Sequence, residues 1–154
     1  MLDDLRELYQ EVILDHGKNP RNFGKPDTVS HHANGHNPLC GDRISVYLDV
    51  DGDGIVRNAA FDGRGCAISQ ASASLMTEIV SGKTLEQVEQ LFRNFHEMCT
   101  SDAKVEMDAD LADEIDRLQV MSGVRQYPIR VKCATLAWHT MNSALEGDGE
   151  ATTE

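Results

Sequence analysis

Three short segments of the chain each carry a cysteine in a setting that suits a metal or sulfur site. The first reads NPLCGDR and places Cys40 two positions before Asp42, with a glycine between them. The segment DGRGCAIS contains Cys66, and the segment RVKCATLAW contains Cys133. Three thiolates and one carboxylate are enough for a tetrahedral zinc site, with zinc–sulfur distances of about 2.3 Å. These residue types therefore favour zinc binding, provided that the fold brings them together.

Two of these thiols are expected near the N-terminal ends of helices. Cys66 precedes a segment of small residues with a helical apolar stripe, and Cys133 falls within the first turns of a helix that Pro128 can begin. The positive end of the helix dipole and the unpaired backbone amides stabilise a thiolate over a thiol. Both thiols are therefore expected to ionise more readily than an ordinary cysteine.

The residues alone leave other interpretations open. The CGD stretch equally suits a tight turn before a strand, and free cysteines are often buried as small apolar side chains. Cys99 has no ligand-like partner near it in the sequence and is interpreted as incidental. The segment 49–54, DVDGDG, imitates a calcium loop, but the twelfth position is Ala60 where a glutamate is needed, so it favours a hairpin turn. The histidines without ligand-like spacing are interpreted as surface residues: His31, His32 and His36.

The elements that must position these residues follow from the apolar pattern. Strands are predicted at 43–50 and 54–63, with an edge strand at 28–33, and helices are predicted before Gly17, from Cys66 to Gly82, after Thr84 and from Pro128 onward. Thr84 and Gln87 form a capping-box signature. The order favours an α+β fold, a small antiparallel sheet of about three strands with helices packed on one face.

The length predicts one domain, covering residues 1–146. Residues 96–124 are acidic and polar and are expected to form a surface insertion, with a short helix around Leu111, Ile115 and Leu118. Residues 147–154, rich in glycine and acidic residues, are expected to be a disordered tail.

The charge and the N-terminal segment exclude several classes of function. A formal net charge of −12 argues against nucleic-acid binding, since phosphates would be repelled. The acidic excess suits either a partner with a basic docking face or simple solubility. The first residues are acidic and lack an uninterrupted apolar run, so neither a signal peptide nor a membrane span is expected. The four cysteines suit a reducing compartment, and we expect a cytoplasmic protein.

The three cysteine segments together resemble a known family. NPLCGD, DGRGCAISQASAS and RVKCATLAW are similar, in order, to the three cysteine motifs of the IscU/NifU N-terminal iron–sulfur cluster assembly family. Lys132, where IscU scaffolds have histidine, and the segment 96–124 resemble the SufU branch, which acts as a zinc-dependent sulfurtransferase.

The resemblance implies a site and partners. It assigns zinc to Cys40, Asp42, Cys66 and Cys133, and sulfur acceptance to Cys40, although the residues leave open whether Cys40 or Cys133 carries the persulfide. The implied donor is the cysteine desulfurase SufS, and the implied recipients are downstream iron–sulfur assembly proteins. The alternative function is an IscU-type scaffold that holds a transient iron–sulfur cluster on the same thiols.

Basic residues near the motifs are candidates for a supporting role. Three thiolates and one carboxylate on Zn²⁺ carry a formal charge of about −2, so a neighbouring cation is expected to help hold the site together. The candidates for this outer position are Arg64, Arg130 and Lys132.

Overall fold

The computed structural model describes residues 2–39, 41–100, 109–147 and 149–152. Its longer helices are α1 (Leu2–Lys18), α2 (Ala67–Val80), α3 (Leu85–Thr100), α4 (Ala112–Leu118) and α5 (Pro128–Glu146). Two 3₁₀ segments, η1 (Ala109–Leu111) and η2 (Gln119–Gln126), flank α4. The strands are β1 (His31–Asn37), β2 (Asp42–Val50), β3 (Val56–Arg64) and β4 (Glu150–Thr152). None of the helices in these ranges is long and apolar enough to cross a membrane.

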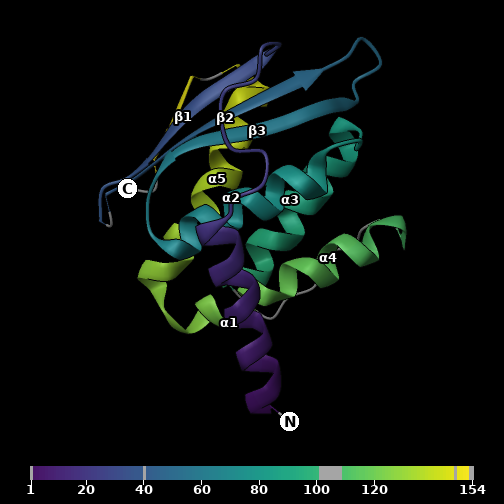
Figure 1. The fold of residues 1–154 in the computed structure, drawn as a ribbon. Helices are drawn as coiled ribbons and strands as arrows, with labels where there is room; N and C mark the ends of the chain where they lie inside the picture. The colour runs from purple at the N-terminus through teal and green to yellow at the C-terminus, as the bar shows by residue number, and fades with distance from the viewer. Residues whose placement is uncertain (1, 40, 101–108, 148, 153–154) are drawn as a thin grey trace.

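The strands form one sheet in the order β3-β2-β1-β4, and the helices lie on one side of it (Figure 1). The pairs β1–β2 and β2–β3 are antiparallel, as the alternating pattern predicts. Along β2, Ile44, Val46 and Leu48 are buried toward the helices. This arrangement confirms the predicted α+β fold.

The fourth strand differs from the sequence prediction. Residues 147–154 are expected to be disordered, and the sheet is expected to have about three strands. In the structure, Glu150–Thr152 pair in parallel with residues 34–36 of β1, and the amide of Asn34 donates to the carbonyl of Gly149 at 2.9 Å. The free edge of β1 offers backbone groups that can order a short polar segment, although that segment has no apolar alternation of its own.

The helix boundaries follow local chemistry. Cys66 is the N-cap of α2, so the helix begins at the predicted cysteine. Pro128 is the first residue of α5, where its missing N–H costs nothing. At α3, the backbone N–H of Gln87 donates to Thr84 Oγ1 at 3.1 Å and that of Thr84 donates to Gln87 Oε1 at 2.9 Å, which confirms the predicted capping box.

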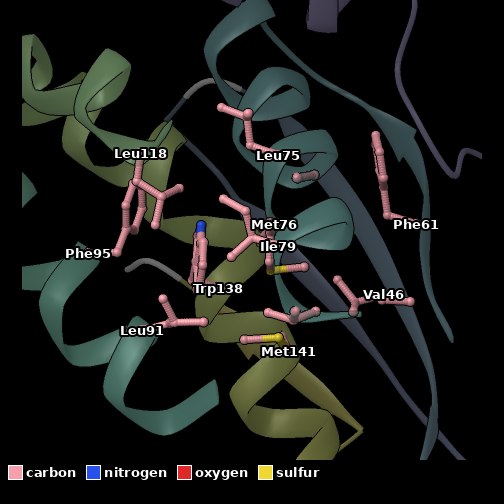
Figure 2. Close-up of a cluster of buried hydrophobic side chains, with 14 of the residues drawn as sticks. Val46, Phe61, Leu75, Met76, Ile79, Leu91, Phe95, Leu118, Trp138 and Met141 are labelled. Atoms are coloured by element: carbon pink, nitrogen blue, oxygen red, sulfur yellow. The ribbon is translucent and has the colours of Figure 1, made fainter. Parts of the chain in front are cut away.

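The core lies between the sheet and α2, α3 and α5. Figure 2 shows Met76 and Ile79 of α2 beside Trp138 of α5, with Phe95 of α3 on the other side of the indole. The Phe95 and Trp138 ring centroids are 4.9 Å apart. Such close packing fixes α2 and α5 relative to one another, and therefore fixes the cysteines at their N-terminal ends.

Residues 96–124 are more deeply integrated than the expected surface insertion. Residues 96–100 belong to α3, and α4 contains the region of the expected short helix. Among the described residues of the segment, six side chains are buried in the core: Met98, Cys99, Leu111, Leu118, Met121 and Val124. The segment therefore covers apolar surface of the core, which its acidic composition conceals in the sequence.

Helix α5 packs against β1 at a close approach that requires glycine. Gly35 is buried, and a Cβ atom at this position would collide with Thr140 Oγ1 and lie 3.1 Å from Thr140 Cβ. The hydroxyl of Thr140 is held in place because it donates to the carbonyl of Leu136 at 2.7 Å. The missing side chain of Gly35 thus sets the spacing between α5 and the sheet.

We expect Gly35→Ala to lower the free energy of unfolding by about 1–3 kcal/mol, because the added methyl group overpacks this contact. Gly52→Ala is the matched control, since a Cβ at Gly52 meets no atom within 4 Å. Chemical denaturation of both variants measures the effect. A Thr140→Ala background should reduce the cost of Gly35→Ala, and equal costs in both backgrounds would contradict the proposed collision.

Candidate metal centre

Three of the side chains assigned by the sequence meet at one end of the sheet. Asp42 begins β2, Cys66 caps α2, and Cys133 lies in the second turn of α5. One carboxylate oxygen and the two sulfur atoms all lie within 4.8 Å of one another. Cys40, the fourth residue that the sequence assigns to this site, is outside the described residues. The fold thus brings together ligand atoms from segments that are far apart in the sequence.

Cys40 belongs to the short connection between β1 and β2, close to Asp42 in the sequence. Four residues, Pro38 to Gly41, join the two strands. Cys40 is two residues from Asp42, and two residues of chain span at most about 7 Å. Cys40 is thus close to Asp42 in the sequence, and its role as a ligand stays a prediction.

The carboxylate of Asp42 is fully buried. Its Oδ1 atom accepts a hydrogen bond from the backbone N–H of Cys66 at 2.9 Å, and its Oδ2 atom accepts one from Asn37 Nδ2 at 3.3 Å. A Cβ atom on Gly65 would lie 2.6 Å from Oδ1. Only glycine lets the chain before Cys66 pass this closely, so the glycine of the DGRGC segment is explained by the carboxylate that it accommodates.

The thiol of Cys66 is set up to ionise. A hydrogen bond with the thiol of Cys133 is the largest cause that lowers the pKa of Cys66, and burial opposes it. The backbone N–H of Ser69 donates to Cys66 Sγ at 3.4 Å, which also stabilises the negative charge. The net result is a pKa of about 6. Cys66 is therefore mainly a thiolate near neutral pH, as its place at a helix N-terminus predicts.

Cys133 is fully buried beside Cys66. Its sulfur accepts a hydrogen bond from Asn37 Nδ2 at 3.7 Å. One residue further along α5, the carbonyl of Ala134 accepts a hydrogen bond from Ser72 Oγ of α2 at 2.5 Å. This bond joins α2 to α5 next to the thiol, and it keeps the two sulfur-bearing helices in register.

The donor set fits a zinc ion. Two ligands of one tetrahedral zinc are about 3.6–3.8 Å apart, given the usual zinc–sulfur and zinc–oxygen distances. The distance from Cys66 Sγ to Asp42 Oδ2 is 4.0 Å, so only a small contraction is required. Among the described residues, no lysine, arginine or histidine forms an ion pair with the buried carboxylate of Asp42. A buried carboxylate beside two thiols is the kind of group that a divalent cation compensates.

The other candidate residues take different places. The three basic candidates lie toward the surface, with Arg64 and Arg130 exposed and Lys132 half-buried. Their supporting role stays a prediction. Asn37, which sequence reasoning missed, contacts two of the proposed ligands. The sequence offered no local signal for it, because the predicted edge strand ends at residue 33 and Asn37 comes to lie opposite Asp42 only through the β1–β2 register.

The remaining cysteine and the histidines lie apart from this group. Cys99 is buried in α3, and burial raises the pKa of its thiol to about 12. In the described part of the chain, Asp42, Cys66 and Cys133 form the one group of three or more histidine, cysteine or acidic side chains close enough to hold a metal. The three histidines of β1 lie outside this group: His31, His32 and His36.

The loop after β2 is a turn, as the sequence predicts. In it, Asp51 Oδ1 accepts hydrogen bonds from the backbone N–H groups of Asp53 and Ile55.

Known proteins are similar to this chain over most of its length. The zinc-dependent sulfurtransferase SufU of Bacillus subtilis is 41% identical over 143 residues, which cover 92% of each chain. The iron–sulfur cluster assembly scaffold protein IscU of Thermotoga maritima is 39% identical, over 90% of this chain and 93% of the relative. The solved structure of the SUF-system protein FiSufU from Fervidobacterium islandicum AW-1 superposes with a TM-score of 0.76 at 35% identity, covering 91% of this chain and 98% of that one.

The family comparison agrees with the cysteine motifs and with the fold. The family described as the NifU-like N terminal domain matches residues 8–134, a range that includes Asp42, Cys66 and Cys133. The chain therefore belongs to the NifU-like N-terminal domain family, whose members among its relatives include SufU and IscU proteins.

Proposed function

We propose that this protein is a zinc-dependent sulfur acceptor and carrier for iron–sulfur cluster assembly. The observation that carries the proposal is the meeting of the Asp42 carboxylate with the thiols of Cys66 and Cys133. The 41% identity with a protein named as a zinc-dependent sulfurtransferase supports it. The proposed sulfur donor is a cysteine desulfurase of the SufS type, and the proposed recipients are downstream iron–sulfur assembly proteins.

Zinc would be held by Asp42, Cys66 and Cys133, with Cys40 as the fourth ligand. Bound zinc would keep these thiols in the thiolate form, which is the form that reacts with sulfur donors. Cys66 is already inclined to ionise through its contacts with Cys133 and the amide of Ser69. Cys40 is the proposed acceptor, since it lies in the short connection between two strands, whereas Cys133 is fully buried.

The proposed transfer is a thiol–disulfide type of exchange. The thiolate of Cys40 attacks the outer sulfur of the persulfide on the desulfurase, a new sulfur–sulfur bond forms, and the donor sulfur–sulfur bond breaks. The desulfurase cysteine leaves as a thiolate, and Cys40 becomes a persulfide. No external oxidant or reductant is required, because one persulfide replaces another.

Exposed apolar side chains flank the site and suit contact with a protein donor. Leu39 is 61% exposed and directly precedes Cys40, while Tyr127 and Ile129, 60% and 55% exposed, lie at the start of α5. Tyr127 and Ile129 line one surface pocket, and apolar side chains clustered at the surface are typical of protein contact sites. They support a protein as the sulfur donor, in preference to a small molecule.

A second candidate function is a scaffold that holds a nascent iron–sulfur cluster. The 39% identity with an IscU scaffold supports it, since clusters are also held by cysteine thiolates. Metal analysis of the purified protein separates the two functions. Stoichiometric zinc without visible absorption supports sulfur transfer, whereas brown protein with iron and sulfide supports the scaffold.

We expect Asp42→Ala to weaken zinc binding by about 100-fold or more, because it removes a proposed ligand, and loss of an outer-shell contact alone typically costs 10–100-fold. Sulfur transfer should fall although every thiol remains. The measurement is zinc content together with the alanine that a SufS-type desulfurase releases per minute. Asp53→Ala, at an exposed turn position, is the control. If zinc content and alanine release both stay at the wild-type level in Asp42→Ala, the site is not a metal centre.

Cys40→Ser should abolish stimulation of the desulfurase and weaken zinc binding, because it removes the proposed acceptor and a soft ligand. Cys99→Ser should retain both properties, since the Cys99 thiol is buried in α3 away from the site. Mass spectrometry of the persulfidated peptides, after incubation with desulfurase and cysteine, identifies the carrier. Persulfide on Cys133 in the wild type would contradict the role of Cys40.

The pKa values predict how the thiols of the metal-free protein react. Alkylation of Cys66 should accelerate as the pH rises through about 6 and then level off, because the thiolate is the reactive form. Cys133→Ala should move this midpoint to higher pH, since the hydrogen bond with Cys133 is the main cause of the low pKa and alanine cannot donate one. Cys99 should stay unlabelled at pH 8 until the protein unfolds. Peptide mapping after timed iodoacetamide treatment measures all three, and a Cys66 midpoint unchanged by Cys133→Ala would refute the coupling.

A further inference from the structure

Asn37 occupies a position beside the metal centre that no cysteine motif explains. It is the last residue of β1, and it lies directly opposite Asp42 in the β1–β2 pair. Its side chain is fully buried. A buried amide must have hydrogen-bond partners, because leaving its polar atoms unpaired costs free energy. The partners of Asn37 therefore indicate what the residue does.

The amide of Asn37 contacts three parts of the site. Its Nδ2 group donates to Asp42 Oδ2 at 3.3 Å and to Cys133 Sγ at 3.7 Å. Its Oδ1 atom accepts the backbone N–H of Leu39 at 3.3 Å. These partners fix which end of the amide is oxygen and which is nitrogen, because the N–H of Leu39 can only donate and an ionised carboxylate can only accept.

We propose that Asn37 is a positioning residue of the metal centre, which orients the oxygen ligand and one sulfur ligand and anchors the connection that carries the sulfur acceptor. The inference rests on the zinc site proposed above. Its nitrogen reaches Asp42 and Cys133, and its oxygen holds Leu39, the residue before Cys40.

The electrostatics of the site explain why an amide suits this place. Three thiolates and a carboxylate around Zn²⁺ carry a formal charge of about −2, so N–H donors to the ligand atoms stabilise the charged set. Hydrogen bonds to ionised groups are stronger than neutral ones, and burial strengthens them further. Unlike a lysine or arginine, an amide provides these donors without the cost of burying a positive charge.

The same amide also links the ligands on β2 and α5 to the connection between β1 and β2. Asp42 and Cys133 are held by β2 and α5, whereas Leu39 belongs to the four residues that join β1 to β2. The bond from the Leu39 N–H to the Asn37 side chain two residues earlier is an Asx-turn contact, which shapes the start of that connection. Removing the amide is therefore expected to disturb both the ligand set and the acceptor segment.

The test compares two asparagines on one strand. Asn37→Leu keeps a similar volume and removes the amide, whereas Asn34→Leu makes the same change at an exposed position of β1. Zinc affinity is measured by competition with a chromophoric chelator on the full chain. We expect the zinc dissociation constant to rise about 10–100-fold for Asn37→Leu, as for other contacts that orient metal ligands, and to change less than about twofold for Asn34→Leu. Equal affinities of Asn37→Leu and the wild type would overturn the proposal.

A spectroscopic measurement separates positioning from a purely structural role. Cobalt(II) in place of zinc gives absorption bands that report ligand geometry, and we expect these bands to shift in Asn37→Leu and to stay unchanged in Asn34→Leu. Thermal unfolding of the metal-free variants reports folding separately. A loss of stability without any change in the cobalt spectrum or the zinc affinity would show that Asn37 only supports the fold.

If Asn37→Leu fails to fold, the wild-type protein still provides the test. In NMR spectra, the side-chain amide of Asn37 should exchange with solvent far more slowly than that of Asn34, and its resonances should move when zinc is added. Rapid exchange, or resonances that zinc does not affect, would overturn the proposal. Wild-type protein that binds no zinc at all would overturn the proposed function itself, which distinguishes that failure from a failure of this inference.

Discussion

The buried carboxylate of Asp42 is the interaction on which the functional end of the structure depends. It accepts the first backbone N–H of the α2 region, from Cys66, and the side-chain amide of Asn37 at the end of β1. Because Asp42 itself begins β2, one side chain joins two strands to a helix N-terminus. The absence of a side chain at Gly65 is what makes this approach possible. The contacts that join the sheet to α2 are thus the same contacts that bring the site residues together.

The two helices that carry the thiols also direct their N-terminal ends toward the Asp42 carboxylate. Both α2 and α5 begin at the end of the sheet where Asp42 lies, so the positive ends of both helix dipoles are near the ligand group. The spacing between these helices is fixed by the core, where Trp138 packs against Phe95, and by the bond between Ser72 and Ala134. Negative charge on the proposed ligands would thereby be stabilised by backbone groups.

Local signals in the sequence predicted the parts of the structure that depend on near neighbours. The helix beginning at Cys66, the proline at the start of α5 and the capping box of Thr84 are all confirmed, because each arises within a few residues. The meeting of Cys66, Cys133 and Asp42 was expected from the motifs and their resemblance to a family, and the structure brings these three together. Their role as metal ligands and the place of Cys40 stay predictions.

The features that the sequence did not predict depend on distant partners. The role of Asn37 requires the register between β1 and β2, and strand β4 requires the free edge of β1. The burial of Leu111 and Met121 requires the apolar surface of the core beneath an acidic segment. In each case the neighbouring residues in the sequence are mostly polar, so the composition suggests an exposed segment. The tertiary contacts that bury or pair the segment come from residues far away in the chain.

Strand β4 also bears on how the protein can be fused and purified. It runs parallel to β1 and pairs Thr152 with His36, the residue before Asn37, so the C-terminal segment points toward the end of the sheet that carries the thiols. Helix α1 extends away from that end (Figure 1). An oligohistidine tag fused after this strand would therefore bring imidazole side chains toward the proposed ligands and compete with them for zinc. A tag placed before α1 keeps the purification handle and the chemistry apart.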